Sequence, residues 1–159
     1  MSKDENTNEK VCAFFASDYH FEMMSLPYIN KCIEEDKRII ILTENNLKET
    51  VNDVIERMNL KDEKKEKILN IDWNKNDSKK IENIKNSLKD KKNVIVFIKG
   101  KEKYVKKINK KIDRKIALKT IDCYDLEGLE KNVDQIIKNY DKVLKTSGEE
   151  VVKKYSKKS

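Results

Sequence analysis

The feature that most constrains the fold is a set of short runs in which nearly every residue is apolar. Residues 11–16 (VCAFFA), 38–43 (RIIILT) and 93–98 (NVIVFI) are too densely apolar for strands with one solvated face. Residues 68–72 (ILNID) form a fourth such run, and residues 117–123 (ALKTIDC) a weaker fifth. Strands buried on both faces are typical of parallel sheets, so we expect about five parallel strands.

Between these runs the apolar residues change to the three- and four-residue spacing of amphipathic helices. The stripes are Leu26, Ile29 and Ile33; Leu47, Val51, Ile55 and Met58; Ile81, Ile84 and Leu88; and Val105, Ile108 and Ile112. A last helix is predicted over residues 126–144, through Leu129, Val133, Ile136 and Tyr140, with Ser147 and Gly148 as its stop.

Strands that alternate with helices imply right-handed crossovers, and hence a three-layer α/β/α arrangement of Rossmann-like or RecA-like type. The length fits one domain over residues 1–159, with residues 1–10 and 148–159 as flexible tails. Pro27 leaves two alternatives for the first helix, which either begins near Ser25 or runs from Phe21 with a kink at the proline.

The distribution of apolar residues and cysteines predicts a cytoplasmic protein without a membrane segment. No run approaches the roughly 20 apolar residues of a membrane helix, and residues 1–10 lack an apolar signal-peptide core. The three cysteines, Cys12, Cys32 and Cys123, are far apart and lie in apolar surroundings. We therefore expect buried, reduced thiols and no disulfide or CxxC site.

The net charge of +7 raises the question of nucleic-acid binding, but its composition argues against specific recognition. The 36 basic residues include only three arginines, Arg38, Arg57 and Arg114, whereas bidentate contacts to phosphates and guanines favour arginine. The predicted helix over residues 101–115 (KEKYVKKINKKIDRK) is the most basic segment. We interpret it as a solvated helix face, and expect any nucleic-acid binding to be weak, nonspecific and sensitive to salt.

In open parallel sheets ligands bind beyond the carboxyl ends of the strands, so those ends are where a site is expected. The polar residues predicted there include Ser17, Asp18, Tyr19, His20, Thr43, Glu44, Asn45, Asn46, Asp72, Trp73, Lys99, Gly100, Tyr124 and Asp125. We select Asp18, His20, Glu44, Asp72 and Lys99 as candidate ligand-binding residues. His20 is the only histidine, so any Ser/His or Cys/His mechanism would require it. Helix capping is the structural alternative for the acidic residues.

Phosphate-binding loops need glycines so that backbone amides can approach the anion. The chain has three glycines, Gly100, Gly128 and Gly148, and contains neither GxxxxGK[ST] nor GxGxxG. Residues 99–101 (KGK) follow a predicted strand and form either a weaker anion site or a simple turn. The sequence identifies no cofactor.

The order of the first strand, RIIILTENN and ILNIDW resembles the core of RecA-like ATPases and of their P-loop-lacking sensor relatives, the MEDS-type domains. The resemblance covers about the first 100 residues and places Glu44 and Asp72 where that family has an acidic residue after its second strand and an Asp at the end of its Walker B strand. The ATPases' Walker A loop is replaced here by ASDYHFEMMSLPYI, without glycine or lysine. The resemblance thus implies a domain that binds or senses rather than hydrolyses ATP.

Three functions therefore compete; the first is preferred, and weak nonspecific nucleic-acid binding through the helix over residues 101–115 ranks third. The first is a non-catalytic, regulatory module whose rim of Asp18, His20, Glu44, Asp72 and Lys99 binds a small ligand or a protein partner. The second is a small hydrolase or transferase that uses three of these carboxylates to hold Mg²⁺, with His20 as acid or base. It requires the carboxylates to converge within about 5 Å. The sequence leaves the ligand open, and likewise whether the chain forms a homo-oligomer.

Overall fold

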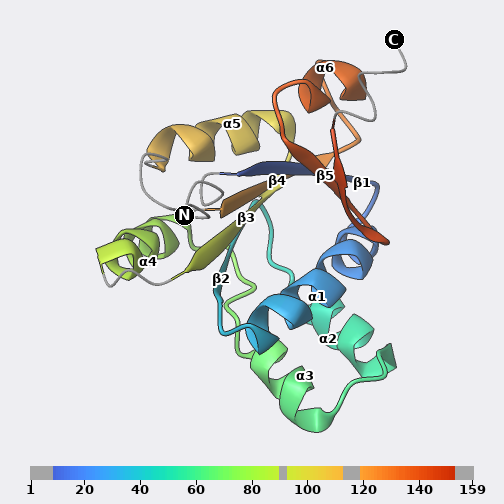
Figure 1. Cartoon of the computed structure of the whole chain (residues 1–159), viewed down its shortest axis with the longest axis vertical. Coiled ribbons are helices and arrows are strands. Elements are labelled where there is room, and N and C mark those ends of the chain that lie inside the picture. Colours follow the sequence, from blue (N-terminus) through green and yellow to red (C-terminus); the bar gives the residue numbers. More distant parts are fainter. Residues whose placement is uncertain (1–8, 90–92, 113–118, 153–159) are drawn as a thin grey trace.

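A computed structural model describes residues 9–89, 93–112 and 119–152, and in these ranges the chain forms a six-stranded sheet and six helices (Figure 1). The strands are β1 (Lys10–Phe15), β2 (Arg38–Thr43), β3 (Val94–Gly100), β4 (Lys119–Asp125), β5 (Lys142–Lys145) and β6 (Gly148–Val151). The helices are α1 (Asp18–Glu34), α2 (Lys48–Arg57), α3 (Asp62–Leu69), α4 (Asp77–Lys89), α5 (Glu102–Lys111) and α6 (Val133–Ile137).

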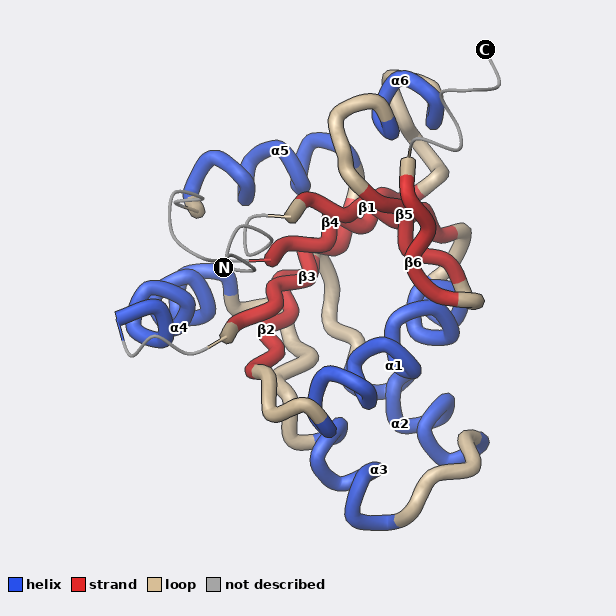
Figure 2. Tube along the Cα trace, in the orientation of Figure 1, coloured by secondary structure: helices blue, strands red, loops and turns tan. Residues whose placement is uncertain are grey.

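The sheet has the order β2-β3-β4-β1-β5-β6 and is parallel except for β6, which pairs antiparallel with β5 (Figure 2). The predicted α/β class with a mostly parallel sheet is therefore confirmed. The order differs from that of dinucleotide-binding folds, in which the first strand lies between the second and the fourth. Here β1 lies between β4 and β5.

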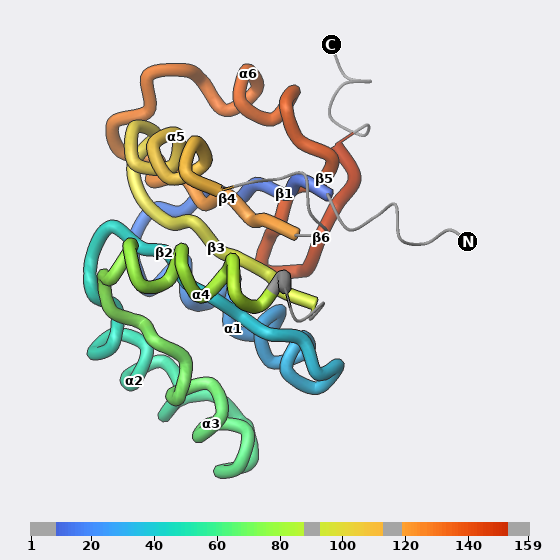
Figure 3. Tube along the Cα trace, turned by 90° about the vertical axis from the view of Figure 1, so that its left-hand side faces the viewer, coloured from blue at the N-terminus to red at the C-terminus, as the bar shows by residue number. Residues whose placement is uncertain are grey.

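The helices form a layer on each face of the sheet (Figures 1 and 3). Because side chains alternate along a strand, Val11, Ala13 and Phe15 of β1 enter the core beneath α1, whereas Cys12 enters the core beneath α5 and α6. Helices α2 and α3 pack on α1, and α4, α5 and α6 cover the opposite face. Every residue of β3 is buried, as expected for a central strand.

The strand predicted over residues 68–72 is wrong. Residues up to Leu69 belong to α3, and the chain then turns. Ile68 and Trp73 are fully buried, and the Trp73 indole N–H donates to the Ile68 carbonyl oxygen at 2.9 Å. A short apolar run cannot by itself distinguish a strand from the buried end of a helix.

The long helix predicted over residues 126–144 is also wrong. Only α6 is helical there, and its start is fixed by a capping box between Asn132 and Gln135. The chain then forms β5, beside β1, and turns through Gly148 at φ 119° into β6. Residues 148–151 are thus part of the sheet rather than of a tail, and residues 153–159 lie outside the described part of the chain.

At the other end of the chain, β1 begins at Lys10, inside the predicted tail, and residues 1–8 lie outside the described part. Helix α1 starts at Asp18, earlier than either alternative considered for it, so Pro27 lies inside the helix. The three cysteines are buried and free, as predicted. Among the described residues no helix is long and apolar enough to cross a membrane.

Trp73 should be a large contributor to stability, because it anchors the turn after α3 in the core. We expect Trp73→Ala to lower the free energy of unfolding by about 3–5 kcal/mol, since it removes a fully buried ring and its hydrogen bond. Urea denaturation measures the change. As a control, Met23→Ala alters an exposed side chain and should change stability by no more than about 0.5 kcal/mol. Equal effects of the two substitutions would contradict this packing.

Candidate functional site

A buried lysine defines the site at the carboxyl edge of the sheet. Lys99 lies near the end of β3, and its side chain faces the same core as that of Phe97, two residues earlier. It is only 2% exposed. Its Nζ lies 4.6 Å from the ring centroid of Phe15 and 5.5 Å from that of Phe21, so the ammonium group packs against aromatic faces.

Two side chains from other loops bind this ammonium group. The Lys99 Nζ lies 2.8 Å from Asp18 Oδ1 and donates to Asn45 Oδ1 at 3.1 Å. The Asn45 amide in turn donates from Nδ2 to Asp18 Oδ2 at 3.0 Å. Lys99, Asp18 and Asn45 thus form a closed triangle, which we call the Lys99 cluster. Asp18 follows β1, Asn45 follows β2 and Lys99 lies at the end of β3, so the sheet topology brings the three residues together.

Local structure holds the two partners in place. Asp18 is the first residue of α1, whose N-cap Ser17 accepts a hydrogen bond from the His20 amide at 3.1 Å. Asn45 is fixed by Thr43, whose hydroxyl donates to the Asn45 carbonyl oxygen at 2.8 Å. The Asp18 side chain remains 33% exposed while Lys99 is buried. Solvent therefore reaches the cluster from the Asp18 side.

Glu22, one turn after Asp18 on α1, adds a second carboxyl group close to the cluster. It is fully buried, and the Thr50 hydroxyl donates to its Oε2 atom. In the described part of the chain its Oε1 atom has no hydrogen-bond partner. Burial, with a smaller contribution from the negative charge of Asp18, raises the pKa of Glu22 to about 7 against the opposing effects of the Thr50 hydrogen bond and Lys99.

Of the five predicted site residues, the structure pairs the side chains of only Asp18 and Lys99, whereas Glu44 meets Lys99 through the backbone, its amide donating to the Lys99 carbonyl oxygen at 3.0 Å. His20 Nδ1 accepts a hydrogen bond from the Ala16 amide at 2.9 Å. Glu44 Oε1 accepts one from the Lys101 amide at 2.9 Å. Asp72 accepts one from the Asn74 amide and lies 3.8 Å from the buried Lys80 ammonium group. These three side chains stabilise turns and a helix start, which is the structural alternative for such residues.

Gly100 shows how closely Glu44 approaches the chain after β3. A Cβ at this position would lie 2.8 Å from Glu44 Oε1 and 2.7 Å from the Tyr104 ring, too close for any side chain. Glycine is therefore needed here for close packing. In the KGK segment Lys99 and Gly100 end β3 and Lys101 is the N-cap residue of α5, so the segment is not the simple turn considered for it. Lys99 points into the core and Lys101 is exposed.

The carboxylates expected to hold a cation, Asp18, Glu44 and Asp72, do not form a metal-binding group in the described part of the chain. Asp18 is paired with Lys99, whose positive charge opposes a cation, and Glu44 and Asp72 are held elsewhere. In residues 9–89, 93–112 and 119–152 no group of three or more His, Cys, Asp or Glu side chains is placed to bind a metal ion. Asp72 also does not end a strand, which removes one of the two positions that supported the RecA-like resemblance.

Helix α5 presents its basic residues as a solvated face. Lys103, Lys106 and Lys107 are exposed, while Tyr104 is 4% exposed and donates from its hydroxyl to Asp77 Oδ1 at 2.8 Å. Tyr104 is thus not placed to stack on a base. Residues 113–115 of the predicted basic helix lie outside the described part of the chain, and weak nucleic-acid binding stays a prediction.

Comparison of the chain with protein-family models, with curated proteins and with solved structures gives no match. Function therefore has to be argued from the chemistry of the site itself.

The raised pKa of Glu22 predicts a pH-dependent stability. The folded state retains a proton that the unfolded chain releases near the ordinary pKa of 4.5, so folding loses stability as the pH rises from about 4.5 through 7. The Glu22→Gln variant is neutral at every pH. Its free energy of unfolding should be about 1–3 kcal/mol higher than that of wild type at pH 8, and this difference should shrink toward pH 5.

The measurement is urea denaturation of both proteins across this pH range. Glu49→Gln, which neutralises an exposed carboxylate on α2, is the matched control and should give no such trend. A stability difference between wild type and Glu22→Gln that stays constant with pH would contradict the assignment.

Proposed function

We propose that the chain is a non-catalytic, regulatory binding module whose ligand is a small anion bound at the Lys99 cluster. The observation that carries this proposal is an almost fully buried ammonium group whose carboxylate partner is one-third exposed. A buried ion pair is weak evidence for stability, because apolar side chains of similar volume often stabilise as well or better. The presence of the pair at this position is more readily explained by binding.

The geometry of Asp18 indicates what the ligand would look like. Its two oxygens take one contact each, from the Lys99 ammonium group and from the Asn45 amide. Carboxylates and phosphates present two oxygens with a similar separation. Such an anion would take over both contacts, while Asp18 turns toward solvent and remains favourably placed at the N-terminus of α1.

The position in the fold supports the same conclusion. Strand β1 connects through α1 toward the far edge at β2, whereas the neighbouring β4 connects in the opposite direction to β5. The cluster lies beyond the carboxyl ends of the strands near this reversal, which is where open α/β sheets bind ligands. Glu44, Asp72 and His20 have local structural partners, so the proposal assigns no residue a catalytic role.

If the bound anion displaces the Asp18 carboxylate from Lys99 and Asn45, two substitutions should have opposite effects on phosphate binding. Asp18→Asn removes the competing charge and should strengthen binding of inorganic phosphate at least about tenfold, whereas Lys99→Met should abolish it. As the pH rises through 7, wild type should lose affinity relative to Glu22→Gln, because Glu22 becomes a second negative charge nearby, whereas the ionisation of phosphate in the same pH range affects both proteins equally.

Phosphate titrations followed by the backbone amide NMR signals of residues 18 and 45 measure these changes at the site itself. Lys103→Met, which removes an exposed lysine of α5, should leave the titration unchanged. Thermal denaturation verifies that each variant is folded. The proposal fails if wild type, Asp18→Asn and Lys99→Met give the same titration.

The proposal also predicts that ATP is not hydrolysed. Phosphoryl transfer needs backbone amides and a lysine around the β- and γ-phosphates, and the loop after β1 has neither glycine nor lysine. Purified protein with Mg²⁺ and ATP should release phosphate no faster than the buffer. Asp72→Ala should not alter that background, and turnover that this substitution abolishes would favour the metal-assisted enzyme instead.

A further inference from the structure

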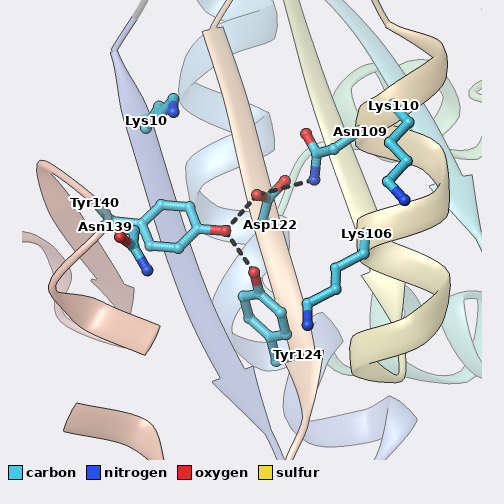
Figure 4. Close-up of a pocket in the computed structure, with 8 residues that line it drawn as sticks. All are labelled: Lys10, Lys106, Asn109, Lys110, Asp122, Tyr124, Asn139 and Tyr140. Carbon is cyan, nitrogen blue, oxygen red and sulfur yellow. Dashed lines mark hydrogen bonds between the residues drawn. The ribbon is translucent and has the colours of Figure 1, made fainter. Parts of the chain in front are cut away.

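A separate, open cavity lies on the other face of the sheet, between α5 and the segment that joins α6 to β5 (Figure 4). It has a volume of about 280 Å³. The register of β3 and β4 pairs Lys99 with Cys123, whose side chain faces α1. Asp122, the preceding residue, points to the opposite face, so this cavity is distinct from the Lys99 cluster.

The floor of the cavity is a network of hydrogen bonds around Asp122. The Tyr140 hydroxyl donates to Asp122 Oδ2 at 2.5 Å, and Asn109 Nδ2 donates to the same atom at 3.2 Å. The Tyr124 hydroxyl lies 2.5 Å from the Tyr140 hydroxyl. Figure 4 shows the three side chains converging on Asp122 from β4, α5 and the segment before β5. Burial raises the pKa of both tyrosines, so both hydroxyls keep their protons.

This network is costly to maintain in the core. Asp122 is 2% exposed and lies between apolar residues of the helix layer, where Cys12, Ile108 and Ile136 are also buried. A buried carboxyl group with hydroxyl and amide partners has no stability advantage over an apolar side chain of the same volume. Because the network lines a cavity, we interpret the network as a contact for a ligand.

Lysines surround the mouth of the cavity. Lys10 approaches from the start of β1, and Lys106 and Lys110 from successive turns of α5 (Figure 4). Lys106 is half-exposed and lies 3.4 Å from Glu102, which partly offsets its charge. The positive charge of Lys10 and Lys110 therefore dominates the entrance and favours an anionic group there.

We propose that this cavity binds a small phosphorylated polyol, such as a sugar phosphate. The phosphate contacts the lysines at the mouth, and a hydroxyl group of the ligand donates to Asp122 on the floor. The volume lies just below the usual range for ligand pockets, which fits a single phosphorylated sugar better than a dinucleotide. An inorganic anion alone would leave the floor without a ligand contact.

The test is a titration with ribose 5-phosphate followed by the ring NMR signals of Tyr124 and Tyr140, which report on this cavity alone. We expect saturable shifts, with ribose requiring at least about tenfold higher concentration because it lacks the phosphate. Lys110→Met should weaken binding of ribose 5-phosphate several-fold and make it less sensitive to salt. Lys103→Met removes an exposed lysine of the same helix that does not line the cavity, and should have no effect.

Two floor variants separate ligand contact from a structural role. Asp122→Asn removes the charged acceptor, and Tyr140→Phe removes one hydroxyl while retaining the ring; both should weaken ribose 5-phosphate binding about tenfold, read from Tyr124. Thermal denaturation verifies that they are folded. The proposal is overturned if ribose 5-phosphate gives no saturable shift, if both floor variants bind like wild type, or if Lys99→Met removes the binding while Asp122→Asn does not. That last result would assign the sugar phosphate to the Lys99 cluster.

Discussion

Burial of the sheet on both faces is the constraint from which both candidate sites follow. Since successive side chains of a strand point to opposite faces, each central strand must supply one set of side chains to the α1 layer and another to the α5 layer. Lys99 follows Phe97 into the first layer, and Asp122 enters the second between Thr120 and Tyr124. Each is a charged residue at a position where the fold requires burial, and each has acquired specific hydrogen-bond partners.

The burial of these polar groups is the observation behind the proposed binding function. Lys99 and Asp122 are surrounded by apolar and aromatic side chains that could fill their volume without any polar partner. Their partners come from segments far apart in the sequence, so each network also fixes how loops and helices meet. Replacing one member of such a network is expected to destabilise the protein more than replacing every member with apolar side chains, because the remaining polar groups stay buried without partners. Variants that conserve volume are therefore the informative ones.

Much of the fold could be predicted from local pattern alone. The dense apolar runs at β1, β2 and β3 and the helical stripes of α2, α4 and α5 are strong signals, and they imply parallel strands. Ile68 was misassigned because a buried helix end and a buried strand look alike over four residues. Residues 126–144 were misassigned because Val133, Ile136 and Tyr140 fit a helix, although the partner that makes β5 a strand is β1, more than 100 residues earlier.

The candidate site was predictable only where topology determines it. The ends of adjacent strands meet at one edge, so Asp18 and Lys99 could be brought together from the sequence. The placement of Glu44 and Asp72 depends on individual hydrogen bonds, to the Lys101 amide and to the Asn74 amide, that no sequence pattern indicates. Glu22 follows Asp18 by one helical turn, a spacing that could have indicated Glu22 as a further member of the site.

NMR of ¹⁵N-labelled Lys99 Nζ and ¹³C-labelled Asp18 Cγ during a phosphate titration tests the central claim most directly. The account predicts that both signals shift with one binding constant, with Asp18 approaching the values of a solvated carboxylate, whereas phosphate that perturbs surface lysines and leaves both signals unchanged would contradict it.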